Sequence, residues 1–141
     1  MSITMHKFFR TKEMILGGSV KLLEDTVKIA ILQPGFTYDK SMVRFSDISG
    51  LEIDQTLYYQ TGGIEVEGKT IATDSDGKAE FTIDTVTYDR INTSIKTIVM
   101  YAETTAYGIE NPMLAYGEFS SILEFYNSAF VLSWPYPIFR W

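Results

Sequence analysis

The feature that most constrains the fold is the run TVKIAIL at residues 26–32, which carries apolar side chains on both faces of a predicted strand. Side chains alternate between the two faces of a strand. One face is therefore wholly apolar and consists of Val27, Ile29 and Ile31. The other face is mixed, because Lys28 shares it with two apolar residues. Such a pattern is typical of a strand inside packed sheets.

Short alternating segments recur along most of the chain. We expect strands at residues 19–23, 64–67, 70–73, 79–83, 85–88, 95–102, 113–119 and 129–134. Between two of them, DSDG at residues 74–77 predicts a hairpin turn, because Asp and Gly favour the required backbone angles. Residues 45–48 predict a single helical turn. Short strands separated by turns at intervals of roughly 8–12 residues predict an all-β fold, a single antiparallel β-sandwich of jelly-roll or Ig-like type.

The length of 141 residues suits one domain, and 45% hydrophobic with 21% charged residues is ordinary for a globular protein. We expect extended segments at both ends of this domain. Residues 1–12 have no clear period and predict an arm or an edge strand. Residues 13–133 form the predicted sandwich, and residues 134–141 form a tail rich in aromatic residues and proline.

The net charge of −6 is unevenly distributed. Residues 1–50 hold seven Lys/Arg and five Asp/Glu (+2), whereas residues 51–141 hold five Lys/Arg and thirteen Asp/Glu (−8). An acidic body argues against nucleic acid as a partner, since phosphates require clustered cations. The basic start, with Lys7, Arg10 and Lys12, is either a solvated terminus or a contact for an acidic surface.

No segment reaches the roughly 18 apolar residues of a membrane span. The first ten residues also lack an uninterrupted apolar core of the kind found in signal peptides. We therefore expect synthesis in a cytoplasm and no membrane partner.

The sequence contains no set of residues that predicts catalysis. His6 is the only histidine and there is no cysteine, so a histidine-based triad would depend on this one residue near the start of the chain. Glu65 and Glu67 lie two apart on a predicted strand and so share one face, whereas a glycosidase pair flanks a cleft. We predict no enzymatic activity, no catalytic residue, no metal and no cofactor.

The tail SWPYPIFRW at residues 133–141 contains two prolines, which favour an extended course without ladder hydrogen bonds. Its large apolar side chains are costly to leave in water. They either pack on the chain's own domain or dock on a neighbouring subunit, and apolar residues near the start present the same choice. The candidate interface residues are Met5, Phe8, Phe9, Trp134, Tyr136, Ile138, Phe139 and Trp141.

The order of short motifs resembles a family of small tailed-phage virion proteins. The matching segments are DTVKIAIL (25–32), FTYD (36–39), EI (52–53), YQTGG (59–63), VEGKT (66–70), FTIDTVTY (81–88), IVMYAET (98–104) and MLAYGEF (113–119). The tail departs from the family pattern, as does Tyr88, which stands where the family usually has Trp.

The resemblance implies a non-enzymatic β-sandwich component of a virion, made in the host cytoplasm. Together with the tail, it leads us to expect a head decoration or cement protein. Its partners would be the major capsid protein or other virion proteins, with self-association in the virion. Two alternatives remain open. One is a tail, neck or fibre-base component, and the other is a carbohydrate-binding module that stacks sugars on Tyr58, Tyr59 or Trp134.

Overall fold

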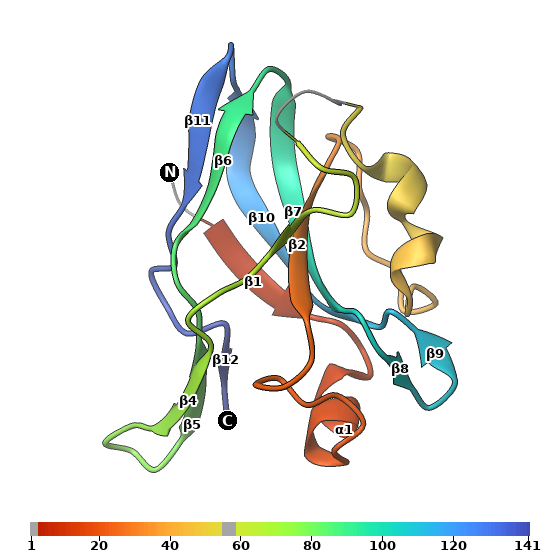
Figure 1. Cartoon of the computed structure of the whole chain (residues 1–141), viewed down its shortest axis with the longest axis vertical. Helices are drawn as coiled ribbons and strands as arrows, with labels where there is room; N and C mark the ends of the chain where they lie inside the picture. The colour runs from red at the N-terminus through yellow and green to blue at the C-terminus, as the bar shows by residue number, and fades with distance from the viewer. Residues whose placement is uncertain (1–2, 55–58) are drawn as a thin grey trace.

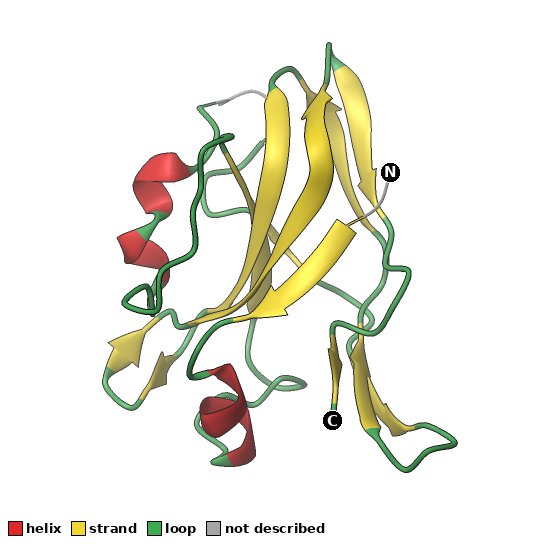
Figure 2. Ribbon diagram, turned by 180° about the vertical axis from the view of Figure 1, so that it is seen from behind, coloured by secondary structure: helices red, strands yellow, loops and turns green. Residues whose placement is uncertain are grey.

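The computed structural model describes residues 3–54 and 59–141, and most of its regular structure is antiparallel sheet (Figures 1 and 2). The largest sheet has five strands in the order β1-β10-β7-β2-β3. These strands are β1 (Ile3–Lys7), β10 (Met113–Glu124), β7 (Ser94–Ala102), β2 (Val27–Leu32) and β3 (Ile64–Glu65). Every pairing in the sheet is antiparallel, so the predicted all-β class is confirmed.

The other strands are divided among three smaller sheets. One pairs β6 (Val86–Ile91) with β11 (Ser128–Leu132). The second contains β4 (Thr70–Thr73), β5 (Ala79–Thr82) and β12 (Phe139–Arg140), and the third pairs β8 (Thr105–Ala106) with β9 (Ile109–Glu110). Within the described ranges, the helices are α1 (Thr11–Leu16) and the 3-10 turns η1 (Phe45–Asp47) and η2 (Ser49–Leu51). None of these helices is long and apolar enough to cross a membrane.

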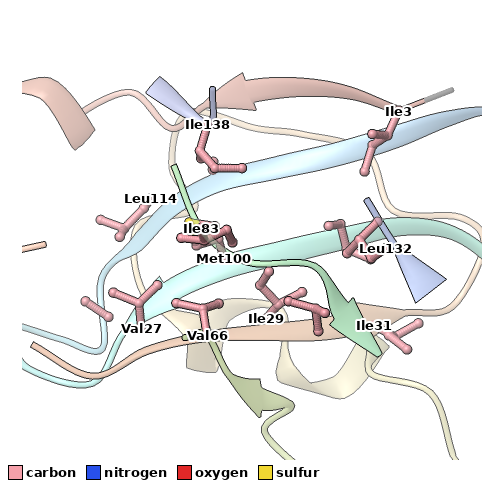
Figure 3. Packing of buried hydrophobic residues seen from close by; sticks show 14 of the residues in the cluster. Ile3, Val27, Ile29, Ile31, Val66, Ile83, Met100, Leu114, Leu132 and Ile138 are labelled. Atoms are coloured by element: carbon pink, nitrogen blue, oxygen red, sulfur yellow. The ribbon is translucent and has the colours of Figure 1, made fainter. Parts of the chain in front are cut away.

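The first face of the large sheet packs against the smaller sheets. Alternate residues of β2 and β7, including Ile29, Ile31 and Met100, meet Ile83 and Leu132 in one buried cluster (Figure 3). The alternation predicted for residues 26–32 is therefore correct. Ile95 also joins this cluster, although Val99 and Tyr101, at alternate positions from it, lie in the cluster on the other face; the pairing of β7 with β10 shifts register at Ile95.

The opposite face of the large sheet is covered by the connection that follows β2. Ala30, Leu32 and Val99 lie in this second buried cluster, under aromatic side chains of the connection. The Phe45 ring stacks on Tyr101 with 4.1 Å between centroids. The 3-10 turn η1 is the helical turn predicted at residues 45–48. Its start is held by the Asp47 carboxylate, which accepts hydrogen bonds from the N–H groups of Val43 and Arg44. The irregular connection after β2 thus covers this face of the large sheet.

A buried polar network fixes the return from this connection to the sheet. The Glu52 carboxylate accepts a hydrogen bond from the Tyr59 hydroxyl and another from the Gly62 N–H at 2.7 Å. The Tyr59 hydroxyl in turn accepts the Ile31 N–H at 3.1 Å. Burial is the larger cause that raises the pKa of Tyr59, and the hydrogen bond to Glu52 raises it further. This phenol therefore stays protonated and continues to donate.

Both segments that the sequence sets apart contribute strands. Within residues 1–12, β1 is an edge strand of the large sheet, as one of the two expectations had it. Within residues 134–141, β12 pairs with β5, so the tail is tied to the protein's own fold. The prediction of a strand at residues 19–23 is wrong. This segment follows α1 and consists of successive turns held by local hydrogen bonds.

Gly63 offers a test of how closely the returning segment approaches β2. Its φ is 91°, and a Cβ there would collide with the Ile29 carbonyl and the Ala30 Cα. We expect Gly63→Ala to lower the free energy of unfolding by about 2–5 kcal/mol, of which about 1–2 reflects φ and the remainder the collision. Gly77→Ala is the control, because Gly77 has φ 81° but open space around it. Equal losses in urea titrations of the two variants would contradict the close approach.

Candidate docking surface

The two terminal segments lie side by side and enclose a notch between β1 and the tail. Its volume is about 200 Å³. Figures 1 and 2 show, from opposite sides, the segment between β11 and β12 passing near the start of β1. The lining residues are Ile3, Thr4, Met5, Trp134, Pro135, Tyr136, Pro137 and Ile138, and none of them is charged. The structure thus brings together Met5, Trp134, Tyr136 and Ile138 from the predicted interface set.

One side of the notch is the free edge of β1. Antiparallel partners alternate between pairs that exchange hydrogen bonds and pairs that do not. The Phe8 N–H donates to the Leu114 carbonyl at 3.1 Å, so in this register Thr4 and His6 are the β1 residues bonded to β10. The main-chain groups of Ile3, Met5 and Lys7 therefore point away from β10. Among the described residues, none of these outward groups has a hydrogen-bond partner.

Gly117 on β10 gives the side chains of β1 room to lie against the sheet. It lies opposite Met5 in the ladder. A Cβ at Gly117 would collide with the side chains of Ile3 and Met5, so the absence of a side chain there lets both residues lie flat against β10. Ile3 is buried and Met5 partly buried, and both pack on the first cluster.

Two lysines meet the last aromatic ring of the tail. The ammonium groups of Lys7 and Lys12 lie 5.5 and 5.7 Å from the centre of the Trp141 ring. Such cation–π contacts are worth about 0.5–1 kcal/mol at exposed sites. Neither lysine forms an ion pair within the part of the chain that the structure describes. Arg10, by contrast, pairs with Glu13 at 2.8 Å, so it is neutralised within the molecule.

An ion-pair cluster anchors the tail to the hairpin that joins β4 and β5. The Arg140 guanidinium lies 2.8 Å from the Asp74 carboxylate and 3.0 Å from that of Asp76. Asp74 also accepts the Lys78 N–H, which closes the predicted turn at residues 74–77. The Lys78 N–H lowers the pKa of Asp74 most, and the Arg140 guanidinium lowers it further. This cluster holds β12 beside β5.

Part of the predicted interface set is used inside the fold. Ile138 and Phe139 are buried in the first cluster, and the Phe139 ring stacks on Phe81. Phe8 is buried in the second cluster. Phe8 and Phe139 are therefore core residues of this chain and are not available to a partner, whereas Ile138 is mostly buried and contributes only a small surface to the notch.

The remaining members of the set differ in exposure. Tyr136 is 76% exposed, on the rim of the notch. Phe9 is 69% exposed but does not line the notch, and the Lys40 ammonium lies over its ring. Trp134 and Trp141 are partly buried. The sequence did not single out Ile3 or Thr4, because only the strand pairing reveals their edge position.

Other candidate sites are not assembled. Tyr59 is buried and offers no free ring face; Trp134 is partly buried and its indole N–H donates to the Asp84 carbonyl at 3.0 Å; Tyr58 lies outside the described residues. His6 stacks on the Tyr116 ring at 4.9 Å. Across residues 3–54 and 59–141, no three His, Asp or Glu side chains gather in a metal-binding arrangement.

The Asp74 anchor predicts a pH dependence. The pKa of Asp74 is lower in the folded state than its unfolded value of about 3.9, so the folded state favours the charged form. Its stabilising contribution is present above about pH 4 and is lost as the pH falls through the folded pKa. Asp74→Asn should therefore be less stable than wild type at pH 6, and this difference should shrink towards pH 3 in urea titrations. A difference that stays constant with pH would contradict the anchor.

Comparison with family models, with curated proteins and with solved structures found no match to this chain. The function proposed next therefore rests on the geometry of the described residues and on the order of motifs in the sequence.

Proposed function

We propose that this chain is a non-enzymatic structural protein of a tailed-phage virion, a head decoration or cement protein that docks on the major capsid protein. The observation that carries this proposal is the surface where the two terminal segments meet. It combines a strand edge, a largely apolar notch, the exposed Tyr136 and two lysines that have no ion-pair partner among the described residues. These are features of a surface that binds a protein rather than one that transforms a substrate.

The body behind this surface is suited to a structural role. We propose that the large sheet and the smaller sheets on its first face act as one antiparallel sandwich. Support comes from the continuous buried cluster that joins them, in which Ile29, Ile31, Ile95 and Phe130 are completely buried. Interiors packed in this way deform little, so a load on the docked surface reaches the whole domain.

The arrangement of polar groups also favours a non-enzymatic role. Glu52 is the one carboxylate of the described chain that is buried, and its partners are the Tyr59 hydroxyl and the Gly62 N–H of its own fold. Glu65 and Glu67 are both exposed, and with Asp84 they line an open hollow of about 270 Å³. The described lining of this hollow contains no histidine, lysine or arginine, so no second type of titratable group faces these carboxylates as a general acid–base pair would require.

Docking by this route would stabilise a capsid through mass action. A protein that binds only the assembled lattice shifts the equilibrium towards it by RT ln(1 + [L]/Kd), which is about 2.7 kcal/mol per site at a concentration of 100 Kd. The acidic body, with its −6 net charge, would face solvent and keep copies of the chain apart.

Point substitutions at exposed residues test this role more cleanly than removal of the tail. Deleting residues 134–141 would remove Ile138 and Phe139 from the core and destabilise the fold. We expect Tyr136→Ser to weaken binding to purified particles that lack this protein by about tenfold, a typical loss for one interface aromatic residue, with no change in stability. Cosedimentation with the particles measures the affinity.

Tyr126→Ser is the matched control, because Tyr126 is 75% exposed and lies beyond β10, away from the notch. We expect it to bind as wild type does. Wild-type protein that fails to bind particles would contradict the docking role. Localisation on intact particles distinguishes a head position from a tail, neck or fibre-base position.

A further inference from the structure

We propose that the notch accepts one extended strand of a partner protein, which adds to the free edge of β1 and places a carboxylate beside Lys7 and Lys12. This inference rests on the proposed docking role and specifies the chemistry of the partner segment.

The main chain of β1 supplies the first requirement. Ile3, Met5 and Lys7 direct their N–H and C=O groups outward, as the register with β10 dictates. An extended peptide laid parallel to this edge would pair with these groups and bring its C-terminal end to Lys7. Strand addition of this kind gives affinity through main-chain hydrogen bonds, and specificity through pockets for alternate side chains.

The tail supplies the second requirement, a wall that does not close the edge itself. Pro135 and Pro137 have no N–H to donate to β1. The Trp134 indole is already bonded to the Asp84 carbonyl. The notch of about 200 Å³ between this wall and β1 is therefore lined by apolar surface and by main-chain groups that remain free among the described residues.

The wall also selects the kind of occupant. Residues 134–138 stand beside the edge, so the β1 strand of a second copy would have to bring its own wall against this one. A single extended segment meets no such obstacle. Along Ile3 and Met5 the surface is apolar, so we expect apolar side chains at alternate positions of the partner strand.

Charge determines one end of the partner segment. Lys7 closes β1, Lys12 belongs to α1, and both ammonium groups lie over the Trp141 ring. In a chain with net charge −6, this pair of cations has no ion-pair partner within the described residues. A carboxylate at this end would pair with both, whereas a lysine there would be repelled.

A peptide experiment tests the inference without particles. The probes are two soluble peptides, Thr-Val-Thr-Val-Glu-Glu and its counterpart Thr-Val-Thr-Val-Lys-Lys, titrated into the full-length ¹⁵N-labelled protein. We expect the amide signals of Ile3, Met5 and Lys7 to shift more than those of Thr4 and His6, because only the former point outward. The Glu-ended peptide should bind at least tenfold more tightly.

The charge-reversed variant Lys7→Glu/Lys12→Glu should prefer the Lys-ended peptide. Both side chains are exposed, so the fold should be preserved, and melting curves check this. The inference is overturned if neither peptide shifts the β1 signals at millimolar concentration. It is equally overturned if the preference is unchanged in the variant.

A second experiment separates strand addition from the docking role. Met5→Pro removes an outward N–H without breaking the β10 ladder, and proline is tolerated on sheet edges. Met5→Leu is the control, since it keeps the N–H and an apolar side chain. We expect Met5→Pro to bind particles at least tenfold more weakly than Met5→Leu, with similar melting temperatures.

If the wild type and both variants bind particles equally, strand addition is wrong while the docking role stands. If the wild type binds no particle but the Glu-ended peptide binds at β1, the virion role fails and strand addition stands. A dimer in sedimentation that Met5→Pro abolishes would identify a second copy as the occupant and overturn the partner segment. If Met5→Pro unfolds the protein, particle binding by Lys7→Glu/Lys12→Glu is compared with particle binding by the wild type. Equal binding then contradicts the inference.

Discussion

The structure depends on one constraint, which is that the central strands of the large sheet are apolar on both faces. In β2, Val27, Ile29 and Ile31 lie in one buried cluster, and Ala30 and Leu32 lie in the other. A sheet of this kind must be covered twice, because each uncovered apolar face would cost about 25 cal/mol per Å². The smaller sheets cover one face, and the aromatic connection between β2 and residue 52 covers the other. Glu52 and Tyr59 then tie the end of that connection back to β2.

The candidate docking surface follows from the way the chain provides this double cover. Covering layers lie above and below the sheet, so they leave its edges open. Among the described residues, the segment 134–138 lines the notch beside β1, and its prolines cannot complete a ladder. The tail is held in place by Phe139 in the core and Arg140 on the β4–β5 hairpin. The candidate docking surface is thus built from two terminal segments that are both anchored in the fold.

Local patterns in the sequence predicted the strands well where the pattern was long. The runs at residues 26–32 and 95–102 match β2 and β7 to within one residue, and the turn at residues 74–77 lies where Asp and Gly indicated. The strand predicted at residues 19–23 was wrong because a short apolar run fits several local structures. The helix α1 was not predicted, because its six residues are too few to show a helical period. The sequence predicted a single sandwich, whereas the described strands are divided among four sheets, and this division depends on contacts distant in sequence. For the same reason composition identified the aromatic residues of the tail but did not separate the buried Phe139 from the exposed Tyr136.

The β1 edge also has to avoid pairing with the strand edges of other molecules, and this requirement limits which strands it could accept. An open strand edge is a template for aggregation, and proteins usually protect such edges with charges, prolines or a covering segment. Here the protection is partial: Lys7 places a charge at one end, and the proline-containing wall stands beside the rest. If a partner strand adds to this edge as proposed, the wall would obstruct another sheet edge with its own flanking chain more than a single extended strand. The features proposed to admit a partner strand of the right charge would then also disfavour pairing between copies of this protein.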